Sequence, residues 1–396
     1  MKKIMCLAMV MVCLIPVLRT NAQDSKQGKR FNMYGIAFYN LENLFDTINN
    51  NGKYDLEFSP NGARQWNHQK YWSKQHNLAY AISQMATKST PNGPVIVGVS
   101  EVENISVLQD LVKQPEIKPW RLQIVHHDSP DRRGIDVGLL YNPRYFKVLN
   151  VTNQRLTIPT NPSFRTRDQL CVTGMLAGEK VSVLVNHWPS RLGGEEQSSY
   201  LREAASAMAR RTIDSLLTDD PNQGIIFMGD LNDDPMNKSC AEVLKAMPNV
   251  KDVQTVSDIY NPFWEKLAKG IGTLAYRGSW NLFDQIVMTP NTVNKKGVKD
   301  FSTLKFWKPQ IFRRDYLFQT EGKYKGNTKR TTAGGIWLDG YSDHLPTAIY
   351  LMKEQGVATK DAGDCLLPDF TEAEKQNIAE CELERQEREA KDKAKQ

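Results

Sequence analysis

Short apolar runs with polar residues directly behind them recur along the chain, and this pattern limits the folds that it can form. Each run has the length and the Val, Ile and aromatic content of a buried strand. Segments 67–85 and 195–217 instead carry apolar residues at helical spacing, and Pro221 follows the second as a stop. Strands that outnumber helices and are buried on both faces predict two packed sheets flanked by helices. The predicted strands are 33–40, 95–101, 136–141, 181–187, 224–230, 283–289 and 346–352.

Both ends of the chain differ from this pattern. Segment 1–22 opens with Lys2 and Lys3, continues through an apolar stretch and closes with small residues, which is typical of a cleaved secretory signal. The apolar stretch is short for a membrane span, and the bulky Val12 before Cys13 disfavours a lipoprotein anchor. We therefore expect an exported protein, periplasmic or secreted, with no stable membrane anchor. Segment 354–396 is expected to be a charged, helical tail, which leaves 31–353 as the main domain.

Charge and cysteines constrain the function only weakly. The signal holds three cations and no acid, so its removal lowers the formal charge from +6 to +3. A mildly basic protein permits nucleic acid as a substrate without indicating it. There is no CxxC or Cys/His spacing for zinc. Four cysteines of the mature chain can pair in three ways, and the sequence leaves the choice open: Cys171, Cys240, Cys365 and Cys381.

Polar side chains follow the predicted strands at the points where those strands end. One polar residue at a strand end is ordinarily a turn residue, so the inference rests on the whole set. If the strands are aligned, their ends converge at one mouth of the sandwich. The residues concerned are Asn40, Glu42, Glu101, His187, Asp230, Asn232, Asp284, Asp343 and His344.

The chemistry of this set suits hydrolysis at phosphorus. Carboxylate and amide oxygens are the ligands of a hard divalent cation, Mg²⁺ or Mn²⁺, with Ca²⁺ also compatible. A carboxylate can activate water, and His or Asn donors can hold the charge that develops. Sequence motifs of other enzyme classes are missing. There is no HExxH motif of zinc proteases and no Walker lysine loop of nucleotide-binding proteins. Ser100 in "GVSEV" lacks the second Gly of the nucleophile elbow that covalent hydrolases use.

The stretch "FMGDLNDDP" at 227–235 is the densest part of the set. A calcium loop beginning at Asp230 places Pro235 where Gly is needed and Ala241 where a bidentate Glu is needed, so that reading fails. A turn explains the acids before Pro235. It leaves Asp230 and Asn232, directly behind the apolar run, as candidates for the site.

Six sequence blocks, in this order, resemble the endonuclease/exonuclease/phosphatase superfamily, which includes deoxyribonucleases, abasic-site endonucleases, neutral sphingomyelinases and inositol polyphosphate phosphatases. They are "FYNLEN", "SEVEN", "NHWPSR", "GDLND", "FDQIV" and "YSDHLP". The likeness spans residue 31 to about residue 352 and looks greatest to exported bacterial members. It implies a four-layered α/β sandwich, with two packed, mainly antiparallel sheets flanked by helices and a site between them.

The resemblance also implies roles for single residues. Glu101 would ligate the metal with help from Glu42 and Asp343. Asn40 would contact the scissile phosphate. His187 would be a donor near the leaving oxygen. Abasic-site enzymes have Tyr at this place, so the histidine disfavours the prediction of a role in abasic-site repair.

The remaining implied roles concern the attacking water and the transition state. Asp230 would orient or deprotonate the water, and Asn232 would fix Asp230 and the phosphate. His344, held by Asp284, would stabilise the transition state or act as the base. Arg191 is a candidate for binding substrate phosphate, with an exposed structural arginine as the alternative.

The sequence is compatible with two roles for each of several basic segments. Arg132 and Arg133 belong to a substrate-binding loop or to a solvated turn. Segment 305–318, with Lys329 and Arg330, forms a phosphate-binding rim or packs as a loop. Arg277 and Trp280 precede Asp284 and are candidates to flank the site; for Trp280, buried packing is favoured over stacking on a base. His126 and His127 are expected in a loop.

The function expected is that of an exported, metal-dependent phosphodiesterase that cleaves nucleic acid, endonuclease-like, by in-line attack of an activated water. The alternatives are hydrolysis of phospholipid head groups or of sugar or inositol phosphates, and a non-catalytic binding scaffold. The sequence leaves open the substrate, endo or exo cleavage, the number of metal ions and the identity of the base.

Overall fold

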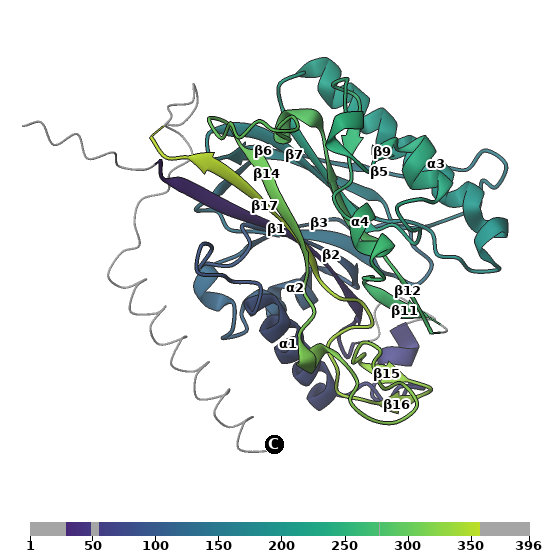
Figure 1. The fold of residues 1–396 in the computed structure, drawn as a ribbon. Coiled ribbons are helices and arrows are strands. Elements are labelled where there is room, and N and C mark those ends of the chain that lie inside the picture. Colours follow the sequence, from purple (N-terminus) through teal and green to yellow (C-terminus); the bar gives the residue numbers. More distant parts are fainter. Residues whose placement is uncertain (1–28, 49–54, 277, 357–396) are drawn as a thin grey trace, which may run out of the picture.

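The computed structural model describes residues 29–48, 55–276 and 278–356. Two large sheets lie face to face, with helices outside them (Figure 1). The six-stranded sheet has the order β14-β17-β1-β2-β4-β3, and only its β1–β2 pair is parallel. Its strands are β1 (Phe31–Leu44), β2 (Ile96–Val102), β3 (Gln123–His126), β4 (Asp136–Tyr141), β14 (Lys305–Ile311) and β17 (Thr347–Glu354).

The seven-stranded sheet has the order β5-β6-β7-β8-β13-β10-β9. Its central pair, β7 and β8, is parallel, and β8 pairs antiparallel with β13. Both sheets are thus mainly antiparallel, as predicted. The strands are β5 (Phe146–Gln154), β6 (Gln169–Leu176), β7 (Glu179–His187), β8 (Gly224–Asp230), β9 (Ala246–Met247), β10 (Ile259–Tyr260) and β13 (Asp284–Met288).

Three hydrophobic cores separate four layers. Alternate residues of a strand point to opposite faces of its sheet. On β1, Ile36 packs into the core between the sheets, whereas Ala37 packs into the core under α1 and α2. On β8, Ile226 packs between the sheets and Ile225 under α3. The expected helix–sheet–sheet–helix sandwich is confirmed. Its outer helices are α1 (His68–Ser83), α2 (Ile105–Val112) and α3 (Glu195–Asp219).

Shorter elements connect the main strands and helices. The β11–β12 and β15–β16 hairpins lie at the same end in Figure 1. A bridge between Leu274 and His344 fastens β11 to the segment before β17. The short elements are α4 (Trp264–Ala268), β11 (Leu274–Tyr276), β12 (Ser279–Asn281), β15 (Thr332–Ala333) and β16 (Ile336–Trp337), with helical turns at Asp55–Phe58, Lys118–Trp120, Ser239–Val243, Val250–Asp252, Pro290–Thr292 and Asp315–Leu317.

The predicted strands are all present, and β4 and β8 have the predicted bounds. The strands that the sequence pattern did not reveal include β5, β6 and β14. Both β5 and β14 are edge strands with many exposed residues, so they lack the continuous apolar run of a buried strand. Pro309, inside β14, is tolerated because an edge strand has a free side. Segment 305–311 is therefore a strand rather than a packed loop.

Some predictions fall outside the described residues. The signal segment 1–22, nearly all of the tail 354–396, Cys365, Cys381 and Arg277 are among them. Cys171 and Cys240 are buried free thiols. Among the helices of the described part, none has the length and apolar character needed to cross a membrane.

Candidate active site

The strand ends of both sheets meet at one place between them. In the seven-stranded sheet, His187 and Asp284 are the register partners of Asp230 on either side. From the other sheet, Asn40 donates its Nδ2 to Asp230 Oδ2 at 3.0 Å. All four side chains are buried, with at most 5% of their surface exposed. The predicted convergence of these polar residues is therefore present.

The backbone at this mouth is unusual. Glu42, Asn43, Glu101 and Asn232 have φ angles of 47°, 53°, 60° and 50°, in the left-handed region that side chains other than Gly seldom adopt. A register shift between β1 and β2 covers the first three of these positions. Bulges and positive φ angles turn side chains out of the regular alternation of a strand, and such strain gathers at functional sites. Here Glu42 and Glu101 lie at such positions, and their carboxylates accept from the backbone N–H groups of Thr331 and Asn43.

His344 and Asp284 form a buried dyad. Asp284 Oδ2 lies 2.7 Å from His344 Nδ1, so the carboxylate holds the proton on Nδ1 and turns Nε2 toward Asp230. His344 Nε2 is 3.8 Å from Asp230 Oδ2. Ser342 Oγ accepts from the His344 backbone N–H at 3.1 Å and donates to the carbonyl of Asn40 at 2.7 Å. The expected support of His344 by Asp284 has a structural basis in these contacts.

The two histidines differ in charge. Burial alone would lower the pKa of His344, but the carboxylates of Asp284 and Asp230 outweigh it and hold that pKa well above 6.5. For His187, burial and the nearby Arg167 and Arg133 together bring the pKa well below 6.5. At neutral pH the site therefore contains an imidazolium at His344 and a neutral imidazole at His187.

Asp230 lies between these histidines. Burial raises its pKa to about 6, although the positive charge of His344 acts in the opposite direction. Its Oδ1 accepts from the backbone N–H of Asn232 at 3.0 Å, while Oδ2 lies 3.6 Å from His187 Nε2. The Asn232 side chain donates to the carbonyl of Trp188 at 3.0 Å. A carboxylate with a pKa near neutrality is suited to take a proton.

A second group of carboxylates, those of Glu42, Glu101 and Asp343, lies among cations of the chain. Glu101 Oε2 accepts from the Asn43 backbone N–H at 2.9 Å and lies 3.3 Å from Arg133 Nη2. Its other oxygen is 4.0 Å from His187 Nε2, which connects this group with Asp230. Arg133 thus belongs to the site and not to a solvated turn.

The cations on the other side of this group are Arg330 and Lys74. Arg330 contacts both Glu42 and Asp343, at 3.1 and 3.0 Å. The fully buried Lys74 donates its Nζ to the carbonyl of Glu42 at 2.7 Å, and burial lowers its pKa to about 8. Lys74 was not predicted from the sequence. The signal that could have revealed it is a lysine at an apolar position of the helical pattern.

The donor set fits a hard divalent cation. Glu42, Glu101 and Asp343 offer the carboxylate oxygens that Mg²⁺ and Mn²⁺ prefer, but these three are not among the groups of described residues whose ligand atoms all lie within 4.8 Å of one another. The dyad and Asp230 form another group, whose ligand atoms all lie within 4.8 Å of one another. In that group Asp284 Oδ1 is buried and has no hydrogen-bond partner among the described residues. Buried oxygens without partners are suited to accept a ligand or a cation.

Arg191 is held by the protein itself. Its Nε donates to the carbonyl of Asn232 at 2.9 Å, and its Nη atoms lie 2.7 Å from Glu195 and 3.2 Å from Asp233. The guanidinium also lies over the ring of Phe283. These contacts position the loop that carries Asn232. Binding of substrate phosphate by Arg191 stays a prediction.

Asp233, expected to be only a turn residue, is an internal anchor. It is 2% exposed, and its Oδ1 lies 2.8 Å from Nε of Arg202, which is fully buried in α3. Removing one partner of a buried ion pair leaves an unpaired charge in a medium of low polarity. We expect Arg202→Met to lower the free energy of unfolding by about 3–5 kcal/mol.

Urea unfolding of the wild type and the variant measures this effect. Lys269→Met is the control, because Lys269 pairs with Glu265 at 3.6 Å and the two side chains are 69% and 74% exposed. An exposed pair of this kind contributes about 0.2–1 kcal/mol. Equal losses of unfolding free energy in the two variants would show that the buried Arg202–Asp233 pair stabilises the fold no more than an exposed pair does.

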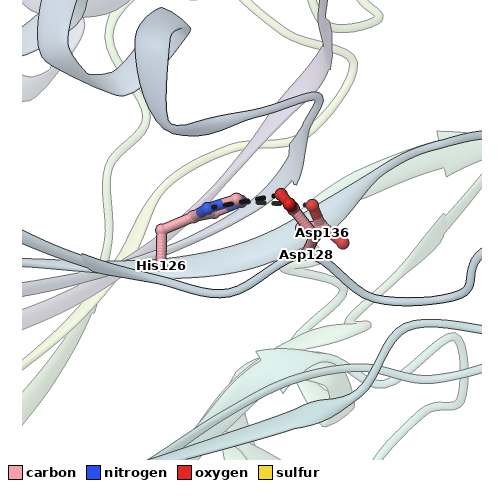
Figure 2. A group of neighbouring side chains, drawn as sticks. All are labelled: His126, Asp128 and Asp136. Atoms are coloured by element: carbon pink, nitrogen blue, oxygen red, sulfur yellow. Dashed lines mark hydrogen bonds and ion pairs between the residues drawn. The ribbon is translucent and has the colours of Figure 1, made fainter. Parts of the chain in front are cut away.

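His126 belongs to a different cluster, with Asp128 and Asp136 (Figure 2). His126 Nε2 lies 3.1 Å from Asp136 Oδ2, and the other Asp136 oxygen accepts from the Ser129 backbone N–H at 2.8 Å. Asp128 is 90% exposed and 3.9 Å away. The cluster fastens the loop before Arg133. His126 was expected in a loop but is the last residue of β3, whereas His127 follows the strand as expected.

The family described as Endonuclease/Exonuclease/phosphatase family matches residues 35–353. No curated protein matches the chain. Among solved structures, a humanised TDP2 of D. rerio is 14% identical, with a TM-score of 0.48, covering 81% of this chain and 98% of that one. A mannosyl-6-phosphatase of Bacteroides thetaiotaomicron is also 14% identical, with a TM-score of 0.48, covering 80% and 99%.

Proposed function

The chain belongs to the endonuclease/exonuclease/phosphatase family, whose members are phosphoesterases that use divalent metals, and we propose that it is a metal-dependent phosphodiesterase acting on nucleic acid after export. The observation that carries the proposal is the buried Asp230, placed between a neutral histidine and an imidazolium. A base and a proton donor side by side are what hydrolysis at phosphorus needs. Mg²⁺ or Mn²⁺ bound by Glu101, Glu42 and Asp343 would neutralise phosphate charge.

The side chains of the mouth divide the reaction between them. Asp230 Oδ2 accepts a proton from the attacking water, which Asn40 Nδ2 helps to orient. His344 donates from Nε2 to a phosphoryl oxygen and stabilises the charge that develops there, while Asp284 fixes its ring. Buried donors placed where charge develops are effective because no solvent must reorganise.

His187 is proposed to serve the leaving oxygen. Its Nδ1 is buried without a hydrogen-bond partner among the described residues, and its Nε2 faces two carboxylates. The tautomer with the proton on Nε2 is therefore favoured. A neutral imidazole in this state donates a hydrogen bond to the oxygen that departs from phosphorus.

A substrate panel tests the proposal. The full-length protein is incubated with Mg²⁺ or Mn²⁺ and plasmid DNA, RNA, sphingomyelin, small phosphodiesters or sugar phosphates, with Asp230→Ala as the control. Nucleic acid is expected to be cleaved by the wild type alone. Cleavage of a lipid or sugar phosphate in its place would favour the alternative substrate classes. No turnover by the wild type, or equal turnover by Asp230→Ala, would contradict the catalytic proposal.

The pH dependence of kcat/KM follows from the shifted pKa values of Asp230 and His344. Asp230 must be ionised to accept a proton, so the rate should rise with pH around its pKa of about 6. His344 must be protonated to donate, so the rate should fall when it loses its proton, at a pH well above 6.5. Initial rates measured from about pH 5 to about pH 10 give this profile. A rate that decreases through pH 6 would contradict the assignment of Asp230 as the base.

A further inference from the structure

Arg330 joins two of the carboxylates assigned to the metal. Its Nε lies 3.1 Å from Glu42 Oε1, and its Nη2 lies 3.0 Å from Asp343 Oδ2. Glu42 lies in β1 and Asp343 lies just before β17, so the guanidinium connects parts of the chain that are far apart in sequence. A planar guanidinium offers donors in a fixed fork and suits two carboxylates at once.

The chain around Arg330 is built onto the same carboxylates. The backbone N–H of Thr331 donates to Glu42 Oε2 at 2.6 Å, and the Thr331 hydroxyl accepts from Lys74 Nζ at 2.5 Å. On the other side, Thr328 donates its hydroxyl to the carbonyl of Asp343 at 2.8 Å. Both threonines are buried. Arg330 is therefore held in place by its neighbours and is not a free surface arginine that happens to lie near acids.

The charges explain why a cation is needed there. Glu42 is 3% exposed, and its ionised form is costly in the interior unless a cation compensates it. Asp343 lies close enough to repel Glu42. Arg330 and Lys74 are the cations beside Glu42 in the described structure. The two carboxylates are thus neutralised by the protein's own side chains.

We propose that Arg330 is an internal counter-cation that competes with the divalent ion for Glu42 and Asp343. The contacts at 3.1 and 3.0 Å use one oxygen of each carboxylate, and an ion that takes these oxygens must displace the guanidinium. Arg330 thereby keeps the acids together without metal and weakens the affinity for metal. This inference rests on the metal site of the proposed function.

The test is the affinity for Mn²⁺ of the full-length Arg330→Met variant, measured by calorimetry without substrate. The variant loses two charge-assisted contacts with the carboxylates, and their strength is reduced by solvent because Arg330 is 41% exposed. Mn²⁺ is therefore expected to bind about tenfold more tightly to the variant than to the wild type. The melting temperature of the variant should fall in chelator and recover with Mn²⁺. Arg314→Met, which removes the same charge from a guanidinium that lies over the ring of Phe312, should match the wild type.

Arg330→Lys keeps a cation and serves if the methionine variant does not fold. A lysine lacks the fork that spans both carboxylates, so the affinity for Mn²⁺ should lie between those of the wild type and Arg330→Met. A folded variant that binds Mn²⁺ no more tightly than the wild type would overturn the proposal, including the case in which neither binds. Turnover without metal would instead contradict the proposed function, so the two failures are distinguishable.

Discussion

Replacement of Asp230 by Asn is expected to lower kcat/KM by a factor of about 10²–10⁴, the usual contribution of a general base. The amide keeps the size of the side chain but has no basic oxygen with which to take a proton. Asn40 and His344 then face a neutral group in place of a carboxylate. Initial rates on the substrate that the panel identifies, at saturating Mg²⁺ or Mn²⁺, measure the loss.

Stability separates this effect from misfolding. Burial raises the pKa of Asp230 to about 6, above its ordinary value of 3.8. Ionised Asp230 therefore destabilises the fold, and this cost develops between about pH 4 and about pH 6 and is complete above that range. Asp230→Asn removes the cost, so its melting temperature should equal or exceed that of the wild type at pH 7. A variant that is folded and fully active would contradict the role of Asp230.

Replacement of Asp284 by Asn is expected to lower kcat by about 10³–10⁴, as loss of the orienting carboxylate does in other carboxylate–histidine pairs. The carboxylate holds the proton of His344 on Nδ1 at 2.7 Å and favours the imidazolium. Without that charge the pKa of His344 falls, and the alkaline limb of the pH profile should move to lower pH. Kinetics across pH and NMR titration of His344 measure the two effects.

Glu116→Gln is the matched control for the Asp284 variant. Glu116 Oε1 lies 2.8 Å from His76 Nδ1, a carboxylate–histidine pair of nearly the same length that includes α1. Its loss can reduce stability, but it leaves the dyad intact. Equal reductions of kcat in both variants would mean that the Asp284 effect is structural and not specific to the dyad.

The sequence predicted the central strands well because each of them is buried on both faces. Asp136–Tyr141 and Gly224–Asp230 have the predicted bounds, since each is an apolar run with an aspartate at one of its ends. The approach of His187, Asp230 and Asp284 follows from the pairing of three neighbouring strands in register. Much of the site could therefore be predicted from the local sequence pattern and from the order of the strands.

What the sequence did not predict depends on contacts between distant segments. Arg330 meets Glu42 only because the loop before β17 folds back over the end of β1. Lys74 is a buried residue on one helix, and its partners are the carbonyl of Glu42 on a strand and the hydroxyl of Thr331 in a loop. Arg191 was a candidate for binding substrate phosphate, which stays a prediction, and its contacts with the loop of Asn232 were not foreseen. Such pairings are set by how loops pack, and neither periodicity nor motif spacing contains that information.

The measurement that tests the central claim most directly is the initial rate of hydrolysis by the wild type in chelator and after Mg²⁺ or Mn²⁺ is restored. Removal of metal should abolish turnover of the phosphodiester, and its return should restore the rate in full, while Asp230→Asn with metal restored stays slower than the wild type by a factor of about 10²–10⁴. Phosphate release that continues undiminished in chelator would contradict a metal-dependent site at these strand ends.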